Sequence, residues 1–103
     1  MITGKLSNGF KYEVDDEAIT SVEFRELIAG TMSKDNQEKI VANSKLLEFL
    51  IGEDKKNELY ALIRKKLGKK YTPVEEVDKC TIEIMKAVEE QNIQAKNSES
   101  SPK

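Results

Sequence analysis

Five of the six residues between positions 46 and 51 are large and apolar, in the order Leu46-Leu47-Glu48-Phe49-Leu50-Ile51. The surrounding sequence predicts a helix, because Asp35 and Glu38 have the spacing of an N-terminal capping box and Gly52 is a typical helix stop. At about 100° per residue, the five side chains cover roughly 200° of the helix circumference, about twice what one core-facing stripe needs. This helix must therefore be buried on two sides.

Two arrangements would bury so wide an apolar surface. The helix is either the central helix of its own domain, or part of its surface meets another subunit or a client protein. The second arrangement would include the next predicted helix, where Tyr60 at the margin of the stripe offers an apolar ring with a polar tip. The candidate partner or oligomer surface consists of Leu46, Phe49, Leu50, Tyr60 and Ile63.

The beginning of the chain predicts a β-hairpin around Asn8-Gly9, a strong turn signal. A two-residue loop would set Ser7 opposite Phe10 and Lys5 opposite Tyr12, which mixes polar and apolar side chains on one face. A three-residue loop, Ser7 to Gly9 with Gly9 left-handed, places all the apolar side chains on one face and is preferred. Its facing pairs are Leu6 with Phe10, Gly4 with Tyr12 and Ile2 with Val14. Since an isolated hairpin is marginal in water, that face must pack on a helix.

Three further helices are predicted from capping signals and apolar stripes. The first begins at Thr20, with Glu23 three positions on, and ends near Gly30. Another runs from about Asp54 to Leu67 and stops at Gly68. The last has Thr72 as its cap, Pro73 at the first helical position and Glu75 completing the box. The inward residues expected of the latter two helices are Leu59, Leu62, Ile63 and Leu67, and Val74, Val77, Thr81, Ile84 and Val88.

From about Asn92 the sequence is polar and lacks core-forming periodicity. We therefore expect one folded domain over residues 1–91 and a disordered C-terminal tail over residues 92–103. The predicted fold class is α+β, mainly α, with an N-terminal β-hairpin packed on about four helices.

The residue types argue against catalysis and metal binding. There is no histidine, which removes His-containing zinc sites, the usual hydrolase triads and the commonest general base. The acidic run Asp15-Asp16-Glu17 lacks the alternating ligands and central glycine of a calcium loop, and suits a helix N-terminus. Cys80, the only cysteine, is expected to be an inert core residue. We expect a protein that is not an enzyme and has no catalytic residues, cofactor or metal.

The charge balance and hydropathy indicate a cytoplasmic protein without a membrane partner. The 17 Lys and Arg and the 19 Asp and Glu give a formal net charge of −2, too near neutrality to attract nucleic acid or anionic membrane as a whole. No apolar run approaches the ~20 residues of a membrane span. The N-terminal residues do not resemble a signal peptide, and a single cysteine suits a reducing compartment.

A basic run, Arg64-Lys65-Lys66-Leu67-Gly68-Lys69-Lys70, holds five positive charges in seven positions. Cations are favoured at a helix C-terminus by the helix dipole, and the run would also suit an acidic partner. The alternative is a nucleic-acid site, but Tyr71 is the only aromatic neighbour and the chain is acidic overall. The candidate acidic-partner surface consists of Arg64, Lys65, Lys66, Lys69 and Lys70.

The order of these segments resembles the tail assembly chaperones of long-tailed bacteriophages. The resemblance covers residues 8–88. It lies in the hairpin Asn8-Gly9-Phe10-Lys11-Tyr12-Glu13-Val14-Asp15 with its short following helix, in Lys45-Leu46-Leu47-Glu48-Phe49-Leu50-Ile51-Gly52-Glu53, in Leu59-Tyr60-Ala61-Leu62-Ile63-Arg64, and in the glycine-led entry Gly68-Lys69-Lys70-Tyr71-Thr72-Pro73-Val74-Glu75-Glu76-Val77.

The resemblance implies a non-enzymatic chaperone that oligomerises, coats the tape-measure protein and recruits tail-tube subunits in the host cytoplasm. It also implies a longer companion product made by ribosomal frameshifting. A long, helical tape-measure protein would suit an apolar helical groove. The alternatives are a small nucleic-acid-binding regulator that uses the run from Arg64 to Lys70, and a small structural adaptor.

Overall fold

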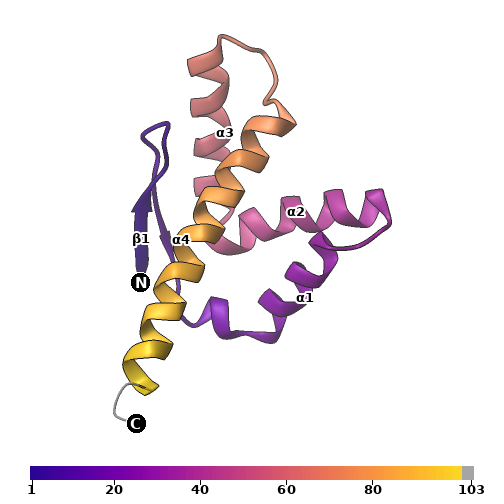
Figure 1. Ribbon diagram of the computed structural model, residues 1–103. Coiled ribbons are helices and arrows are strands. Elements are labelled where there is room, and N and C mark those ends of the chain that lie inside the picture. The colour runs from indigo at the N-terminus through magenta and orange to yellow at the C-terminus, as the bar shows by residue number, and fades with distance from the viewer. Residues whose placement is uncertain (101–103) are drawn as a thin grey trace.

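The computed structural model describes the backbone of residues 1–100 and the side chains of residues 1–91. Over this part of the chain, an antiparallel β-hairpin precedes four α-helices, with a short 3-10 turn between (Figure 1). The elements are β1 (Ile2–Lys5), β2 (Lys11–Val14), η1 (Ala18–Thr20), α1 (Val22–Thr31), α2 (Asn36–Ile51), α3 (Glu53–Leu67) and α4 (Val74–Ser100). The predicted fold class, α+β and mainly α, is confirmed.

The hairpin has the predicted three-residue loop and register. Ile2 faces Val14 and Gly4 faces Tyr12 in the antiparallel pair. The Leu6 amide donates to the Phe10 carbonyl over 2.8 Å, which closes the ladder next to the turn. Gly9 has a φ of 94°, a conformation that disfavours any side chain, so the loop requires glycine there.

The apolar face of the hairpin joins one hydrophobic core with α2, α3 and α4. Figure 1 shows α4 running diagonally beside the hairpin. In this view α2 crosses α4, and α1 lies below α2. The contacts of α2 with α1, α3, β2 and α4 make it the central helix. Among the largest fully buried side chains are Val14 of the hairpin, Leu47 of α2, Leu59 of α3 and Ile84 of α4.

The helix boundaries follow the predicted signals with two corrections. Asp35 caps α2 by accepting hydrogen bonds from the amides of Gln37 and Glu38, as expected. Gly52 and Gly68 end α2 and α3. α4 begins at Val74, one residue after the predicted Pro73, and the Thr72 hydroxyl accepts a hydrogen bond from the Arg64 guanidinium. The second correction is at the start of α1. The cap of α1 is Ser21 rather than Thr20, since the Ser21 hydroxyl accepts from the Phe24 amide over 3.1 Å. Thr20 closes η1 instead, donating its hydroxyl hydrogen to the Glu17 carbonyl.

Two residues of the predicted inward stripes are exposed. Leu59 and Ile63 of α3 and Thr81, Ile84 and Val88 of α4 are buried as expected, and Leu62 and Val77 are half-buried. Leu67 and Val74 are instead 45% and 71% exposed. Leu67 ends α3 and Val74 begins α4. This end of the helix pair extends beyond α2 (Figure 1), so no other element covers the two side chains.

The backbone of α4 continues as a helix to Ser100, past the end near Asn92 that the sequence predicts. The predicted disordered tail over residues 92–103 lies outside the residues whose side chains the structure describes. The domain boundary at residue 91 therefore stays a prediction.

Candidate functional site

The five residues of the candidate partner or oligomer surface lie mostly in the protein's own core. Leu46, Leu50 and Ile63 are each less than 5% exposed. Phe49 and Tyr60 are half-buried, and the Phe49 ring stacks on Phe24 of α1 with 6.5 Å between the centroids. Most of the wide apolar surface of α2 is thus covered within the monomer, as the central-helix alternative requires. Of the five, only Phe49 and Tyr60 offer partly exposed side chains.

Two adjoining hollows flank the crossing of α2 and α4, and Asn43 of α2 lines both. The first, about 170 Å³, has Ile40, Tyr60, Val74 and Val77 among its lining residues. The second, about 300 Å³, extends along α4 to α1 and is lined in part by Ile28, Met32, Ile82 and Met85. We call the two hollows together the α2–α4 groove.

The α2–α4 groove gathers four large apolar side chains that are more than half exposed. Ile40 and Val74 are 63% and 71% exposed at the first hollow, and Met32 and Ile82 are 76% and 54% exposed at the second. Scattered apolar residues are normal on a protein surface, but several around one concavity mark an interaction site. The groove is therefore a candidate protein-binding site.

None of these four residues was predicted from the sequence to lie on a partner surface, although two carried a usable signal. Ile82 lies two positions before the buried Ile84, and Ile40 two positions before the buried Ala42. Two positions correspond to about 200° around a helix, so an apolar residue at this spacing cannot share the buried stripe. Met32 follows the last residue of α1, where periodicity gives no information, and periodicity wrongly placed Val74 in the inward stripe of α4.

The candidate acidic-partner surface lies at the C-terminal end of α3 and in the following loop, as predicted. Two of its five cations also donate hydrogen bonds within the protein. The Arg64 guanidinium donates to the Thr72 hydroxyl over 2.9 Å, and the Lys66 ammonium donates to the Asn8 carbonyl. Lys65, Lys69 and Lys70 are exposed, and the Lys70 ammonium lies 5.5 Å from the centroid of the Tyr71 ring. The contact of Lys66 connects this basic end of α3 with the hairpin turn.

The hairpin turn is also fastened to α4. The amide and the hydroxyl of Ser7 both donate to the Glu83 carboxylate over 2.9 Å. The Asn8 side chain donates to the Cys80 sulfur over 3.8 Å. Cys80 is buried, as predicted, and burial together with the nearby Glu83 and Glu76 raises its pKa to about 11. Because a thiolate is the reactive form, this cysteine is not a nucleophile at neutral pH.

The described part of the chain holds neither a metal-binding cluster nor a membrane-spanning helix. Within it, no three His, Cys, Asp or Glu side chains come together as metal ligands would. None of its helices combines the length and the apolar character needed to cross a membrane. Comparisons of the chain with protein-family models, with curated proteins and with solved structures gave no match.

Proposed function

We propose that this protein is a non-enzymatic tail assembly chaperone that binds helical segments of other proteins in the α2–α4 groove. The observation that carries the proposal is the cluster of exposed Met32, Ile40, Val74 and Ile82 around one concave surface. Leaving these side chains in water has an unfavourable free energy of hydration, which a bound partner would remove.

The shape and residue types of the groove suit an amphipathic helix. Helix-binding grooves receive apolar side chains at i, i+3, i+4 and i+7, and two adjoining hollows offer two such positions along one direction. Met32 and Met85 are unbranched and adaptable, which suits a receptor that accepts several related segments. A client with repeated helical segments would fit such a receptor.

The identity of the client rests on the resemblance to phage tail assembly chaperones. It makes the tape-measure protein the helical client, with tail-tube subunits and further copies of this chain as additional partners in the host cytoplasm. A tape-measure gene beside the gene for this protein would support the assignment, and a genomic neighbourhood without tail genes would contradict it.

Calorimetric titration with purified fragments of the neighbouring tape-measure protein tests the groove directly. Val74→Glu and Ile82→Glu, one at each hollow, should weaken binding at least about tenfold, because each places a charge in the apolar contact. Val22→Glu is the matched control, since Val22 is 55% exposed and begins α1 as Val74 begins α4. It should change binding less than about twofold. Equal effects of all three substitutions would refute the groove as the binding site.

A salt titration against generic duplex DNA distinguishes the chaperone from the alternative, a nucleic-acid-binding regulator. Phosphate contacts by the run from Arg64 to Lys70 would give DNA binding that falls steeply with salt concentration. We expect no binding at physiological salt. A structural adaptor would bind a partner without preferring tape-measure fragments over unrelated helices.

A further inference from the structure

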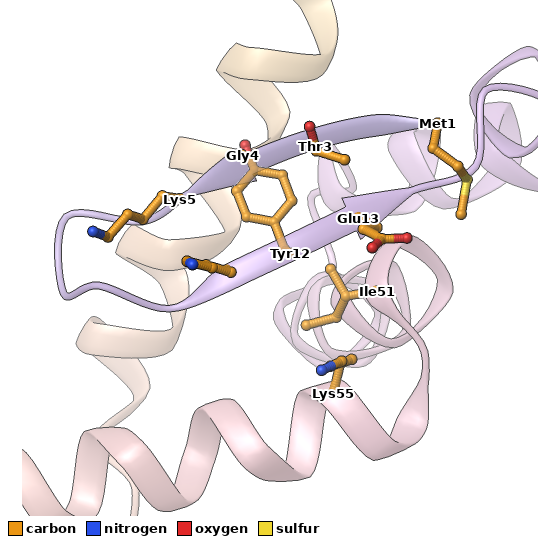
Figure 2. A pocket seen from close by; sticks show the side chains of 9 residues that line it. Met1, Thr3, Gly4, Lys5, Tyr12, Glu13, Ile51 and Lys55 are labelled. Atoms are coloured by element: carbon orange, nitrogen blue, oxygen red, sulfur yellow. The ribbon is translucent and has the colours of Figure 1, made fainter.

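A third hollow lies over the hairpin, on a different part of the surface from the α2–α4 groove (Figure 2). Its volume is about 660 Å³, and residues of both strands line it together with Ile51 of α2 and Lys55 of α3. Figure 2 shows the Tyr12 ring projecting from β2 across β1 at Gly4. We call this hollow the hairpin pocket.

The hairpin pocket contains an unfavourable pair of like charges. Lys5 and Lys11 are directly opposite each other in the hairpin, and both are exposed. Like charges at facing positions destabilise a β-ladder. Within the described residues, no carboxylate forms an ion pair with either lysine. The third cation, Lys55, makes only an exposed 3.5 Å pair with Glu58, which a ligand could replace at little cost.

The backbone beside these lysines is available for pairing. In an antiparallel ladder, hydrogen-bonded and non-hydrogen-bonded pairs alternate. Leu6 and Phe10 form a hydrogen-bonded pair, so the next such pair along the ladder is Gly4 with Tyr12. Thr3 and Lys5 belong to the non-hydrogen-bonded pairs that alternate with them. Their backbone N–H and C=O groups therefore point away from β2. β1 packs against α4, and in the described part of the chain the sheet has only two strands. The outer edge of β1 therefore has no neighbouring strand.

We propose that the hairpin pocket binds an extended acidic peptide segment of a partner protein. The segment adds beside β1 and pairs its backbone with Thr3 and Lys5, as in recognition by strand addition. Its carboxylates lie between Lys5 and Lys11, which relieves the repulsion between the facing lysines. This site is separate from the α2–α4 groove and does not depend on the tail-chaperone assignment.

Charge and residue type favour a peptide over a nucleic acid. Glu13 also lines the pocket, so a nucleic acid, with a phosphate at every position, would meet its charge, whereas a peptide can place a neutral residue beside it. The three cations are lysines, which act as point charges and lack the bidentate geometry of arginine toward phosphate. A free strand edge pairs with a peptide backbone, which a nucleic acid lacks.

The test follows the amide resonances of the ¹⁵N-labelled full-length protein during titration with the capped hexapeptide Thr-Glu-Val-Glu-Thr-Glu. The matched probe replaces each glutamate by glutamine, and a second probe is N-methylated at alternate residues to block strand pairing. We expect shifts concentrated at Thr3, Lys5, Lys11 and Glu13, about tenfold weaker binding of the glutamine peptide, and loss of binding for the N-methylated one. The binding constant should fall as salt rises.

The double variant Lys5→Gln/Lys11→Gln should weaken peptide binding at least about tenfold while melting no lower than wild type, because it removes the repulsion. The control Lys34→Gln/Lys39→Gln makes the same change in net charge at exposed lysines around the start of α2 and should bind like wild type. Three results would each overturn the proposal: no hairpin shifts at millimolar peptide, equal binding of the glutamine peptide, or tighter binding of a 12-base-pair DNA or of inorganic phosphate at these amides.

Discussion

At the scale of single residues, the contact between Gly4 and Tyr12 shows why the hairpin needs a small residue in β1. A Cβ built at Gly4 would lie 2.5 Å from Cζ of Tyr12 and closer still to its hydroxyl oxygen. The backbone of Gly4 has no positive φ, so the reason for glycine is space rather than conformation. The Tyr12 ring covers this gap and is itself 5% exposed. Burial, with the nearby Glu83 charge as the smaller cause, raises the pKa of Tyr12.

Gly4→Ala should therefore lower the free energy of unfolding by about 1–3 kcal/mol, the usual cost of overpacking. Urea denaturation of a double-mutant cycle with Tyr12→Val measures the effect. Valine lacks the ring atoms that meet the new methyl group, so Gly4→Ala should cost little in the Tyr12→Val background. The same cost in both backgrounds would show that the ring is not the obstacle.

The raised pKa of Cys80 predicts a loss of stability at alkaline pH. The folded state holds the thiol proton up to about pH 11, whereas an unfolded cysteine loses it near pH ~8.5. Above that value the unfolded state binds fewer protons than the folded state. The stability that Cys80 contributes to the folded state is therefore fully present below about pH 8 and is lost as the pH rises toward 11. It amounts to about 3 kcal/mol.

Urea melts of wild type and Cys80→Ala between pH 7 and pH 10 measure this contribution. The wild-type free energy of unfolding should fall with pH, and the slope should be clearly smaller in the variant. The pH dependence that remains in Cys80→Ala measures the titration of the other groups whose pKa differs between the folded and unfolded states, including Tyr12. Identical slopes in the two proteins would mean that Cys80 titrates normally. Alkylation of native Cys80 by iodoacetamide at pH 7.5 should be slow and should speed up on unfolding.

At the scale of elements, the hairpin depends on side chains from α3 and α4 that hold its turn. Glu83 accepts both hydrogen bonds from Ser7, and Lys66 donates to the Asn8 carbonyl. A two-stranded hairpin alone is marginal in water. These contacts join residues 58 and 76 positions apart, so they position the hairpin on the helices rather than forming its turn.

Glu83→Ala should lower the free energy of unfolding by about 1 kcal/mol, because the Ser7 bonds lie near the surface, where water partly replaces them. Hydrogen exchange at the Ser7 amide should become faster, which identifies the local cause. Glu90→Ala is the control on the same helix, since Glu90 is exposed and should change stability by less than about 0.5 kcal/mol. Unchanged exchange at Ser7 in Glu83→Ala would contradict this role.

At the scale of the whole molecule, the core and the candidate binding sites lie on different surfaces of the same few elements. The inner face of α2 is occupied by the monomer's core, while Ile40 at its N-terminal end remains exposed beside Val74 of α4. The hairpin likewise buries one face and exposes Lys5 and Lys11. A binding partner could therefore reach both sites without unfolding the protein.

Self-association, which the resemblance implies, should proceed through the α2–α4 groove if it occurs. Sedimentation velocity at tens of micromolar should show dimers or larger species for wild type. Ile40→Glu should shift the distribution to monomer, because it places a charge in the groove. Since Ile40 is exposed, the substitution should leave the fold intact. The control Val22→Glu should sediment as wild type does. A monomeric wild type would contradict self-association.

The features that the sequence determined by itself are local. The Asn8-Gly9 turn and the alternation around it predicted every facing pair of the hairpin, because a one-residue slip would expose the whole apolar face. The Asp35 cap and the Gly52 and Gly68 stops followed from hydrogen bonds within one turn of each helix end. The burial of Cys80 followed from its place on an apolar stripe.

Only the tertiary structure decided which apolar surfaces are covered. The width of the stripe around Leu46 to Ile51 indicated two-sided burial but not whether a neighbouring helix or a partner supplies it. That depends on how α1 and α4 pack against α2, which no local pattern encodes. For the same reason, the exposure of Val74, the Glu83 contact with Ser7 and the α2–α4 groove could not be predicted. Each depends on the relative orientation of elements far apart in the chain, which is set by how their side chains pack.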